Sequence, residues 1–262
     1  MLRAILPHGL VRYLDWKARF ERIGVSGTRA WSEASRQAIL KSRIELLPEV
    51  KSGRFGCVLD VGANLGDWAG SLLQFCKIDS LHAFEPNPHL AKTLQTRFSS
   101  HPGIRNFVLH QSAVGNVSAQ TTFNITSGSA LSSVLAPNEK CNELYPNDAA
   151  IIEKITVPIV RLDDVIPKEQ IIDVFKLDVQ GYERMALEGS AETLKRTKAI
   201  LLETHYISHY VNDDNISSLF DLMTNKYGFK YFNMSACERD SHGRATWADC
   251  CFINPALVKV AG

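Results

Sequence analysis

Val58-Leu59-Asp60-Val61-Gly62-Ala63-Asn64-Leu65-Gly66 is the stretch that decides the fold of this chain. Residues 57–61 form a short apolar run with one acid, which is typical of a central parallel strand. Gly62 and Gly66 then mark a turn, and a helical pattern begins at Asp67. Because glycine has no side chain, the backbone of such a turn can approach a ligand and use positive φ angles. This order of strand, turn and helix predicts a cradle for a nucleotide-type ligand.

The composition is that of an ordinary globular protein. The chain has 262 residues, 45% hydrophobic and 22% charged, which fits one large domain, or one domain with an extension. A net charge of +1 gives no reason to expect nucleic acid or an anionic membrane as partner. There is no apolar stretch of ~20 residues and no long apolar N-terminal segment, so we expect no stable membrane insertion and no signal peptide.

Six cysteines are present, and none has C-x-x-C spacing. Buried free thiols in a reducing, cytoplasmic location are the favoured interpretation. The adjacent Cys250 and Cys251 could form a redox pair, but two residues on opposite faces of a strand are the preferred explanation.

Two regions are expected. Residues 1–52 are expected to form an N-terminal helical extension. This extension would pad the sheet, cover the active site as a lid or make a dimer contact. Residues 53–262 are expected to form the main domain. Strands are expected over 57–61, 80–85, 104–110, 120–125, 155–160, 172–178 and 199–204. Helices are expected over 67–76, 87–98, 181–188 and 215–227. This alternation predicts an α/β fold with a mostly parallel, doubly wound sheet.

Two further segments break the alternation. Residues 229–234 and 248–253 are expected to form an antiparallel hairpin at the sheet edge, since no helical pattern lies between them. Residues 126–154 are expected to be a long irregular stretch. A loop of this length is usually functional or disordered, so it is either an acceptor-binding loop or merely solvated.

Glu85 ends the second expected strand, 19 residues after Gly66. An acid in this place can accept hydrogen bonds from both hydroxyls of a ribose. The alternative is a surface carboxylate at a turn. Asn87 follows two residues later, and we assign both side chains to the cofactor site.

The turn itself discriminates between cofactors. Asn64 stands where a dinucleotide-binding G-x-G-x-x-G turn has its second glycine, and its side chain would crowd a pyrophosphate. The turn of Gly62, Asn64 and Gly66 better suits a ligand that has a ribose and an amino-acid end but no phosphate. S-adenosylmethionine is such a ligand. Asp60 would then face the ligand's ammonium group or organise the turn.

The third strand leads into Ser112 and Ala113. In this layout their turn would reach the adenine, and a hydroxyl and a small side chain suit the edges of a flat base. A plain β-turn is an equally good interpretation.

The strand within 172–178 carries Lys176 and Asp178 on one face. Charges inside a buried strand are costly unless they are paired or functional, so these two could simply pair with each other. Asp178, however, comes at the carboxyl end, where open α/β sheets bind ligands. Glu183 opens the next helix and could cap it instead.

The next strand ends in Glu203-Thr204-His205 at the same edge. Isolated histidines are more often structural. His205 nevertheless follows an acid at a strand end beside Asp178, which suits a proton acceptor with a tuning carboxylate.

Together these residues resemble the FkbM-type S-adenosylmethionine-dependent methyltransferases over roughly 57–205. The most specific match is the run from Phe175 to Glu183, and the glycine-containing turn alone would be weak. The other matching stretches are 59–66, 84–87, 187–190 and 201–205. The resemblance implies a class I methyltransferase fold, which is Rossmann-like, with a seven-stranded sheet and an antiparallel C-terminal hairpin. It also implies O-methylation of a hydroxyl on a sugar, a glycan or a related natural product.

For that reaction we expect His205 as general base, with Asp178 as its partner or as a ligand to the acceptor hydroxyl. The acids Asp178, Glu183 and Glu203 could alternatively hold Mg²⁺, which is not favoured because capping and ion pairing explain them without a metal. Competing functions are a nucleotide-cofactor oxidoreductase and a non-catalytic S-adenosylmethionine-binding protein of the same fold. A homodimer is possible.

Overall fold

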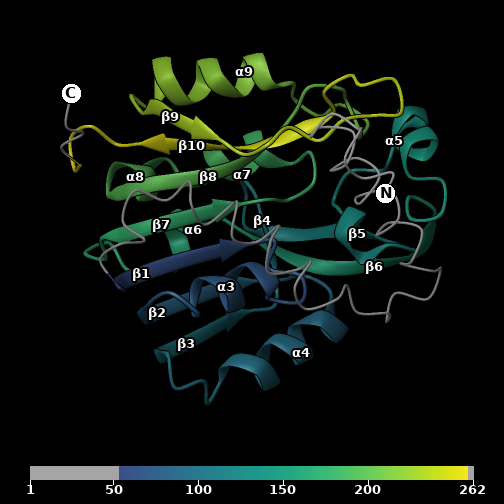
Figure 1. Cartoon of the computed structure of the whole chain (residues 1–262). Helices are drawn as coiled ribbons and strands as arrows, with labels where there is room; N and C mark the ends of the chain where they lie inside the picture. Colours follow the sequence, from purple (N-terminus) through teal and green to yellow (C-terminus); the bar gives the residue numbers. More distant parts are fainter. Residues whose placement is uncertain (1–52, 259–262) are drawn as a thin grey trace, which may run out of the picture. The chain divides into compact units, whose positions relative to one another are not determined.

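The computed structural model describes residues 53–258 (Figure 1). The predicted N-terminal helical extension, residues 1–52, lies outside the described residues, so the lid, padding and dimer hypotheses stay predictions. The main element is a seven-stranded sheet. In spatial order its strands are β3 (Ile104–His110), β2 (Lys77–Phe84), β1 (Arg54–Val61), β7 (Ile172–Leu177), β8 (Thr197–His205), β10 (Trp247–Ile253) and β9 (Lys230–Met234).

Strands β3, β2, β1, β7 and β8 pair in parallel, and β10 is antiparallel to both β8 and β9. The predicted doubly wound sheet with an antiparallel C-terminal hairpin is therefore confirmed. β1 leads to β2 on one side, whereas its other neighbour is β7. The strand order thus reverses between β1 and β7, and in open α/β sheets the crevice at such a point is where ligands bind.

Helices cover both faces of the sheet, as Figure 1 shows. On one face, α3 (Asp67–Leu72) and α4 (Pro88–Phe98) pack Leu72, Leu94 and Phe98 against β1 and β2. The opposite core receives residues from α6 (Leu162–Val165), α7 (Glu183–Glu188), α8 (Ala191–Lys195) and α9 (Ile216–Asp221). The helix expected over 67–76 ends at Leu72, and the helix expected over 215–227 is α9 followed by a π-turn, Leu222–Lys226.

A second, three-stranded sheet corrects the sequence-based expectation. The strands expected at 120–125 and 155–160 are outside the main sheet and pair antiparallel with each other as β5 (Ala119–Thr126) and β6 (Ile151–Val160). β4 (Ala113–Val114) pairs in parallel with β6. Phe123, Val157 and Ile159 form a separate small core there. An apolar alternation predicts a strand but does not identify the sheet that it joins.

Residues 126–154 are also more regular than expected. They contain a 3-10 turn, η3 (Ser129–Leu131), a helix, α5 (Glu139–Leu144), and the start of β6. Asn138 caps α5 by accepting a hydrogen bond from the Cys141 N–H at 2.9 Å. The Asn138 side chain also donates to the carbonyl of Ser208, so the segment is attached to the loop that follows β8.

The six cysteines lie within the described residues and are free thiols, as predicted. Cys250 and Cys251 both lie on β10, where Cys250 belongs to one face's core and Cys251 to the other's. The opposite-face interpretation of this pair is thus confirmed. Across residues 53–258 no helix has the length and apolarity to span a membrane.

Candidate functional site

The turn after β1 is built from residues with positive φ. Gly62, Asn64 and Gly66 have φ values of 75°, 50° and 76°. The N–H groups of Gly62 and Ala63 both donate to the carbonyl of Phe84, the last residue of β2. A Cβ atom on Gly66 would lie 2.4 Å from the Phe98 ring of α4, so this glycine is required for packing. The turn is therefore held tightly to both neighbouring elements.

Glu85 is buried directly beside this turn. Its carboxylate accepts hydrogen bonds from the backbone N–H groups of Asn64 and Asn87, each at 2.8 Å. Burial raises the pKa of Glu85, and the two hydrogen bonds lower it by less. The resulting pKa is about 7. Asn87 also caps α4, because its side chain accepts from the His89 N–H at 3.0 Å. Each carboxylate oxygen has a second lone pair, so Glu85 can still accept from a ribose hydroxyl.

Asn64 connects the turn to the 126–154 segment. Its Oδ1 atom accepts from the N–H of Leu65 at 2.8 Å and lies 3.5 Å from the hydroxyl of Ser129 in η3. The segment that was expected to be irregular therefore reaches the predicted cofactor turn. Ser129 was not identified from the sequence.

Ser112 and Ala113 are buried at the carboxyl end of β3. Ala113 begins β4 and pairs with Ile159 of the second sheet, so this is not a plain β-turn. The carbonyl of His110, just before, accepts from the N–H of Glu85 at 3.1 Å. Ser112 and Ala113 thus lie next to Glu85, where the adenine side of the predicted site is expected.

Lys176 links β1 to β7 at the point where the strand order reverses. Its Nζ atom donates to the carbonyl oxygen of Gly62 at 2.6 Å and lies 3.2 Å from Asp178 Oδ2 and 3.6 Å from Asp60 Oδ1. The expected pairing of Lys176 with Asp178 is present. Asp60 is 0% exposed, its carboxylate makes no hydrogen bond within the described residues, and burial raises its pKa. Asp178 is the most open of the three, with 18% of its side chain exposed.

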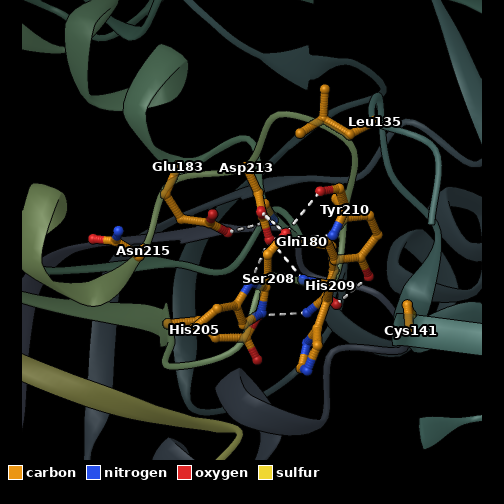
Figure 2. Close-up of polar contacts among 12 residues, drawn as sticks. Leu135, Cys141, Gln180, Glu183, His205, Ser208, His209, Tyr210, Asp213 and Asn215 are labelled. Atoms are coloured by element: carbon orange, nitrogen blue, oxygen red, sulfur yellow. Dashed lines mark hydrogen bonds and ion pairs between the residues drawn. The ribbon is translucent and has the colours of Figure 1, made fainter. Parts of the chain in front are cut away.

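Gln180 bridges the ends of β7 and β8, and Figure 2 shows it beside Tyr210. Its Nε2 atom donates to Asp178 Oδ1 at 2.7 Å and to Glu203 Oε2 at 2.6 Å. Its Oε1 atom accepts from the hydroxyl of Tyr210 at 2.6 Å. Neither Gln180 nor Tyr210 was identified from the sequence as a site residue.

His205 lies between two carboxylates other than the predicted Asp178. Its Nδ1 atom is 3.3 Å from Asp213 Oδ2, and its Nε2 atom is 3.6 Å from Glu203 Oε2. Burial by itself lowers the pKa of His205, but the hydrogen bonds with Asp213 and Glu203 outweigh it and raise the pKa to about 10. An imidazolium at neutral pH has no free lone pair for a proton. Both ring nitrogens of His205 face carboxylates of the protein, and the role of His205 as general base stays a prediction.

Asp213 also anchors the loop after β8, because it accepts from the N–H groups of His209 and Tyr210. Glu183 has a comparable role in the loop after β7. Its Oε1 atom accepts from the N–H groups of Val179 and Gly181, at 3.0 and 3.2 Å. The capping of the next helix that the sequence offered as an alternative for Glu183 is not present, because these donors belong to the loop before α7 and the N-cap residue, Tyr182, makes no side-chain capping bond. Burial raises the pKa of Glu183 to about 7.

The charges of the site indicate what it can hold. Asp60, Glu85 and Asp178 surround the turn, and Lys176 is the cation among them. This set holds three acids and one lysine, which is compatible with the predicted cationic, phosphate-free ribose ligand. Between residues 53 and 258, no three or more His, Cys, Asp or Glu side chains form a group that could hold a metal ion.

Solved structures of methyltransferases are similar to this chain at low sequence identity. One is the magnesium protoporphyrin IX methyltransferase of Synechocystis PCC 6803, at 9% identity, TM-score 0.48, and 90% coverage of each chain. Another is the 1,6-didemethyltoxoflavin-N1-methyltransferase of Burkholderia thailandensis, at 12% identity, TM-score 0.44, and coverage of 95% of this chain and 90% of that one. A third is TrmK of M. capricolum, at 11% identity, TM-score 0.46, and coverage of 82% and 66%.

No curated protein matches the chain in sequence. The Methyltransferase FkbM domain, in contrast, matches residues 60–231, which is more than half of the chain. The matched region begins at Asp60 and includes Glu85, Asp178 and His205, the acids and the histidine of the site described above. The chain therefore belongs to the family of methyltransferases that carry the FkbM domain.

Proposed function

We propose that this chain is an S-adenosylmethionine-dependent O-methyltransferase that acts on a hydroxyl group of a sugar, a glycan or a related natural product. The observation that carries the proposal is the direct contact between the turn after β1 and Asp178. A Cβ atom on Gly62 would lie 1.7 Å from the carbonyl oxygen of Asp178. The expected cofactor turn and an acceptor-facing carboxylate are thus adjacent at the crevice where open α/β sheets bind ligands.

The residues around the turn have distinct roles toward the cofactor. Glu85 accepts hydrogen bonds from the ribose hydroxyls with its remaining lone pairs. Asp60 provides a negative charge for the ammonium group, and Ser112 and Ala113 flank the adenine. S-adenosylmethionine, when bound, supplies an electrophilic sulfonium methyl group. Because the donor is already reactive, the chain's main contribution is to position the acceptor oxygen.

Asp178 is the residue that we place at the acceptor. Its partly exposed carboxylate accepts a hydrogen bond from the acceptor hydroxyl and takes its proton as the oxygen attacks. Lys176, whose Nζ atom is 3.2 Å away, forms an ion pair with this carboxylate. His205 acts indirectly in this scheme, as the cation held between Glu203 and Asp213. The sequence-based hypothesis, in which His205 is the base, is tested by comparing the turnover of Asp178→Asn with that of His205→Gln.

A methyl-transfer assay tests the proposal. The protein is incubated with tritiated-methyl S-adenosylmethionine and a panel of sugars, glycans and polyketide-type alcohols. The expected result is a radiolabelled ether on one acceptor class, absent with Asp178→Asn. Cofactor binding without transfer to any acceptor would support the non-catalytic alternative.

Two further measurements separate the remaining alternatives. Calorimetry with S-adenosylmethionine and with NADH distinguishes a methyltransferase from an oxidoreductase, and tighter binding of NADH would contradict the proposal. Treatment with EDTA tests the Mg²⁺ alternative. Loss of activity that Mg²⁺ restores would assign Asp178, Glu183 and Glu203 to a metal.

A further inference from the structure

We propose that Gln180 is a positioning residue for methyl transfer, whose side-chain amide holds the carboxylates of Asp178 and Glu203 in place at the ends of β7 and β8. The inference rests on the proposed function, because that function places Asp178 at the acceptor. It adds a residue that does not itself touch the reacting atoms.

Both N–H donors and the oxygen of the amide have hydrogen-bond partners. An amide nitrogen has two N–H groups, and here one points to each carboxylate, at 2.7 Å for Asp178 and 2.6 Å for Glu203. The amide oxygen accepts from Tyr210 at 2.6 Å. An ionised carboxylate has no hydrogen to donate, so the nitrogen side of the amide faces Asp178 and Glu203 when they carry their charges. The orientation of Gln180 is therefore determined by three partners from three different segments.

The backbone around Gln180 is also constrained. Gln180 has a φ of 58° and Gly181 a φ of 90°, and residues other than glycine are uncommon in this region. The hydroxyl of Ser133 donates to the carbonyl of Gln180 at 2.8 Å and helps to hold the conformation. The Tyr210 hydroxyl also lies 3.2 Å from the carbonyl of Leu131 in η3. Glutamine at a position that favours glycine indicates that its side chain has a role.

The need for a bridging donor follows from the charges that face Glu203. Asp178 lies at the end of β7, and Asp249 pairs in register with Glu203 from β10. His205 is the opposing cation. Burial and the charge of Asp178 raise the pKa of Glu203 to about 8. Without the amide, the carboxylates of Asp178 and Glu203 would face each other with no donor that bridges them, and Asp178 would keep Lys176 but lose the hydrogen bond that ties it to Glu203.

A titration tests this inference without cofactor or acceptor. Carbon-13 NMR follows the side-chain carboxyl of Glu203 with pH, and its signal is assigned with Glu203→Gln. In Gln180→Met, which removes both donors at similar size, we expect the Glu203 midpoint to rise by about one pH unit or more, because the ionised form loses a hydrogen bond. Tyr210→Phe should also raise the Glu203 midpoint, but by a smaller amount. Gln95→Met on the exposed side of α4 is the matched control and should leave it unchanged.

An unchanged midpoint in folded Gln180→Met would overturn the inference. If circular dichroism shows that Gln180→Met does not fold, Tyr210→Phe decides, and an unchanged midpoint there overturns it equally. With an acceptor identified, Gln180→Met should lower kcat about tenfold or more while S-adenosylmethionine affinity stays within about threefold. If the wild type transfers methyl groups and the Glu203 midpoint is unchanged in Gln180→Met, the positioning role alone is refuted. If the Glu203 midpoint shifts in Gln180→Met but the wild type transfers no methyl group to any acceptor, the proposed function alone is refuted.

Discussion

A side-chain carbon on Gly62 would lie 1.7 Å from the carbonyl oxygen of Asp178. The turn after β1 therefore packs backbone to backbone on the residue that follows β7, and no L-amino acid with a Cβ atom fits there. Lys176 reinforces this contact, since its Nζ atom bonds the Gly62 carbonyl and pairs with Asp178. A displacement of the turn at Gly62 would therefore also move Asp178, which we propose lies at the acceptor.

Gly62→Ala tests how tight this contact is. Gly228 provides a matched control, because its φ of 72° is nearly that of Gly62 and a Cβ atom there would meet nothing within 4 Å. Both variants incur the backbone strain of a positive φ, and Gly62→Ala adds a steric overlap. We expect Gly62→Ala to reduce the free energy of unfolding in urea by about 1–3 kcal/mol more than Gly228→Ala does. Equal losses would contradict the contact.

Glu85 should make cofactor affinity depend on pH. Its pKa is raised from 4.5 to about 7, so its carboxylate ionises as the pH rises through about 7. Because the ionised form accepts hydrogen bonds from ribose hydroxyls, S-adenosylmethionine affinity measured by calorimetry should rise between pH 6 and pH 8.

Glu85→Gln should remove this pH dependence and weaken binding at pH 8 by about 1–3 kcal/mol, the cost of imperfectly paired polar groups. Glu192→Gln, on an exposed surface, is the control and should behave as the wild type. If Glu85→Gln retained the wild-type pH dependence, Glu85 would not be the ribose partner.

His205 should stabilise the fold in a defined pH window. Its pKa is raised from 6.5 to about 10, so the folded state binds the proton more tightly than the unfolded state. This contribution is fully present below pH 6.5 and is lost as the pH rises through about 10. The urea stability of the wild type and of His205→Gln should therefore differ most near pH 6 and least above pH 10.

The expected difference near pH 6 is about 3 kcal/mol or more, because the variant leaves Glu203 and Asp213 without their cation. His89→Gln, on the exposed start of α4, should be nearly neutral at every pH. A His205→Gln deficit that does not change with pH would show that the imidazole is held uncharged.

Asp178→Asn tests the assignment of the proton acceptor. The amide retains the size of the side chain but cannot accept a proton, so turnover should fall by about 10²–10⁴-fold while S-adenosylmethionine affinity changes little. Asp221→Asn, at the exposed end of α9, is the control. If Asp178→Asn kept most of its turnover and His205→Gln lost it, the original assignment of His205 as base would be restored.

Local patterns predicted most of the main sheet. The run before Gly62 is apolar because β1 is buried on both faces, and residues 229–234 and 248–253 lack an intervening helix because they form the hairpin of β9 and β10. Which sheet β5 and β6 would join could not be predicted, since a two-residue alternation is the same in either sheet. The helix α5 was missed because Cys141 is its single buried residue, which gives no apolar periodicity, and α8 was missed because it has only five residues.

The sequence by itself determined the family, the glycine-containing turn after β1 and the acids at the carboxyl ends of the strands. Each of these depends on a short, contiguous motif. Only the tertiary structure decided which partners those side chains have. Gln180, 23 residues before Glu203, joins it to Asp178, and Asp213 rather than Asp178 faces the Nδ1 atom of His205. The protonation state of a buried histidine depends on such contacts, and no spacing along the chain encodes them.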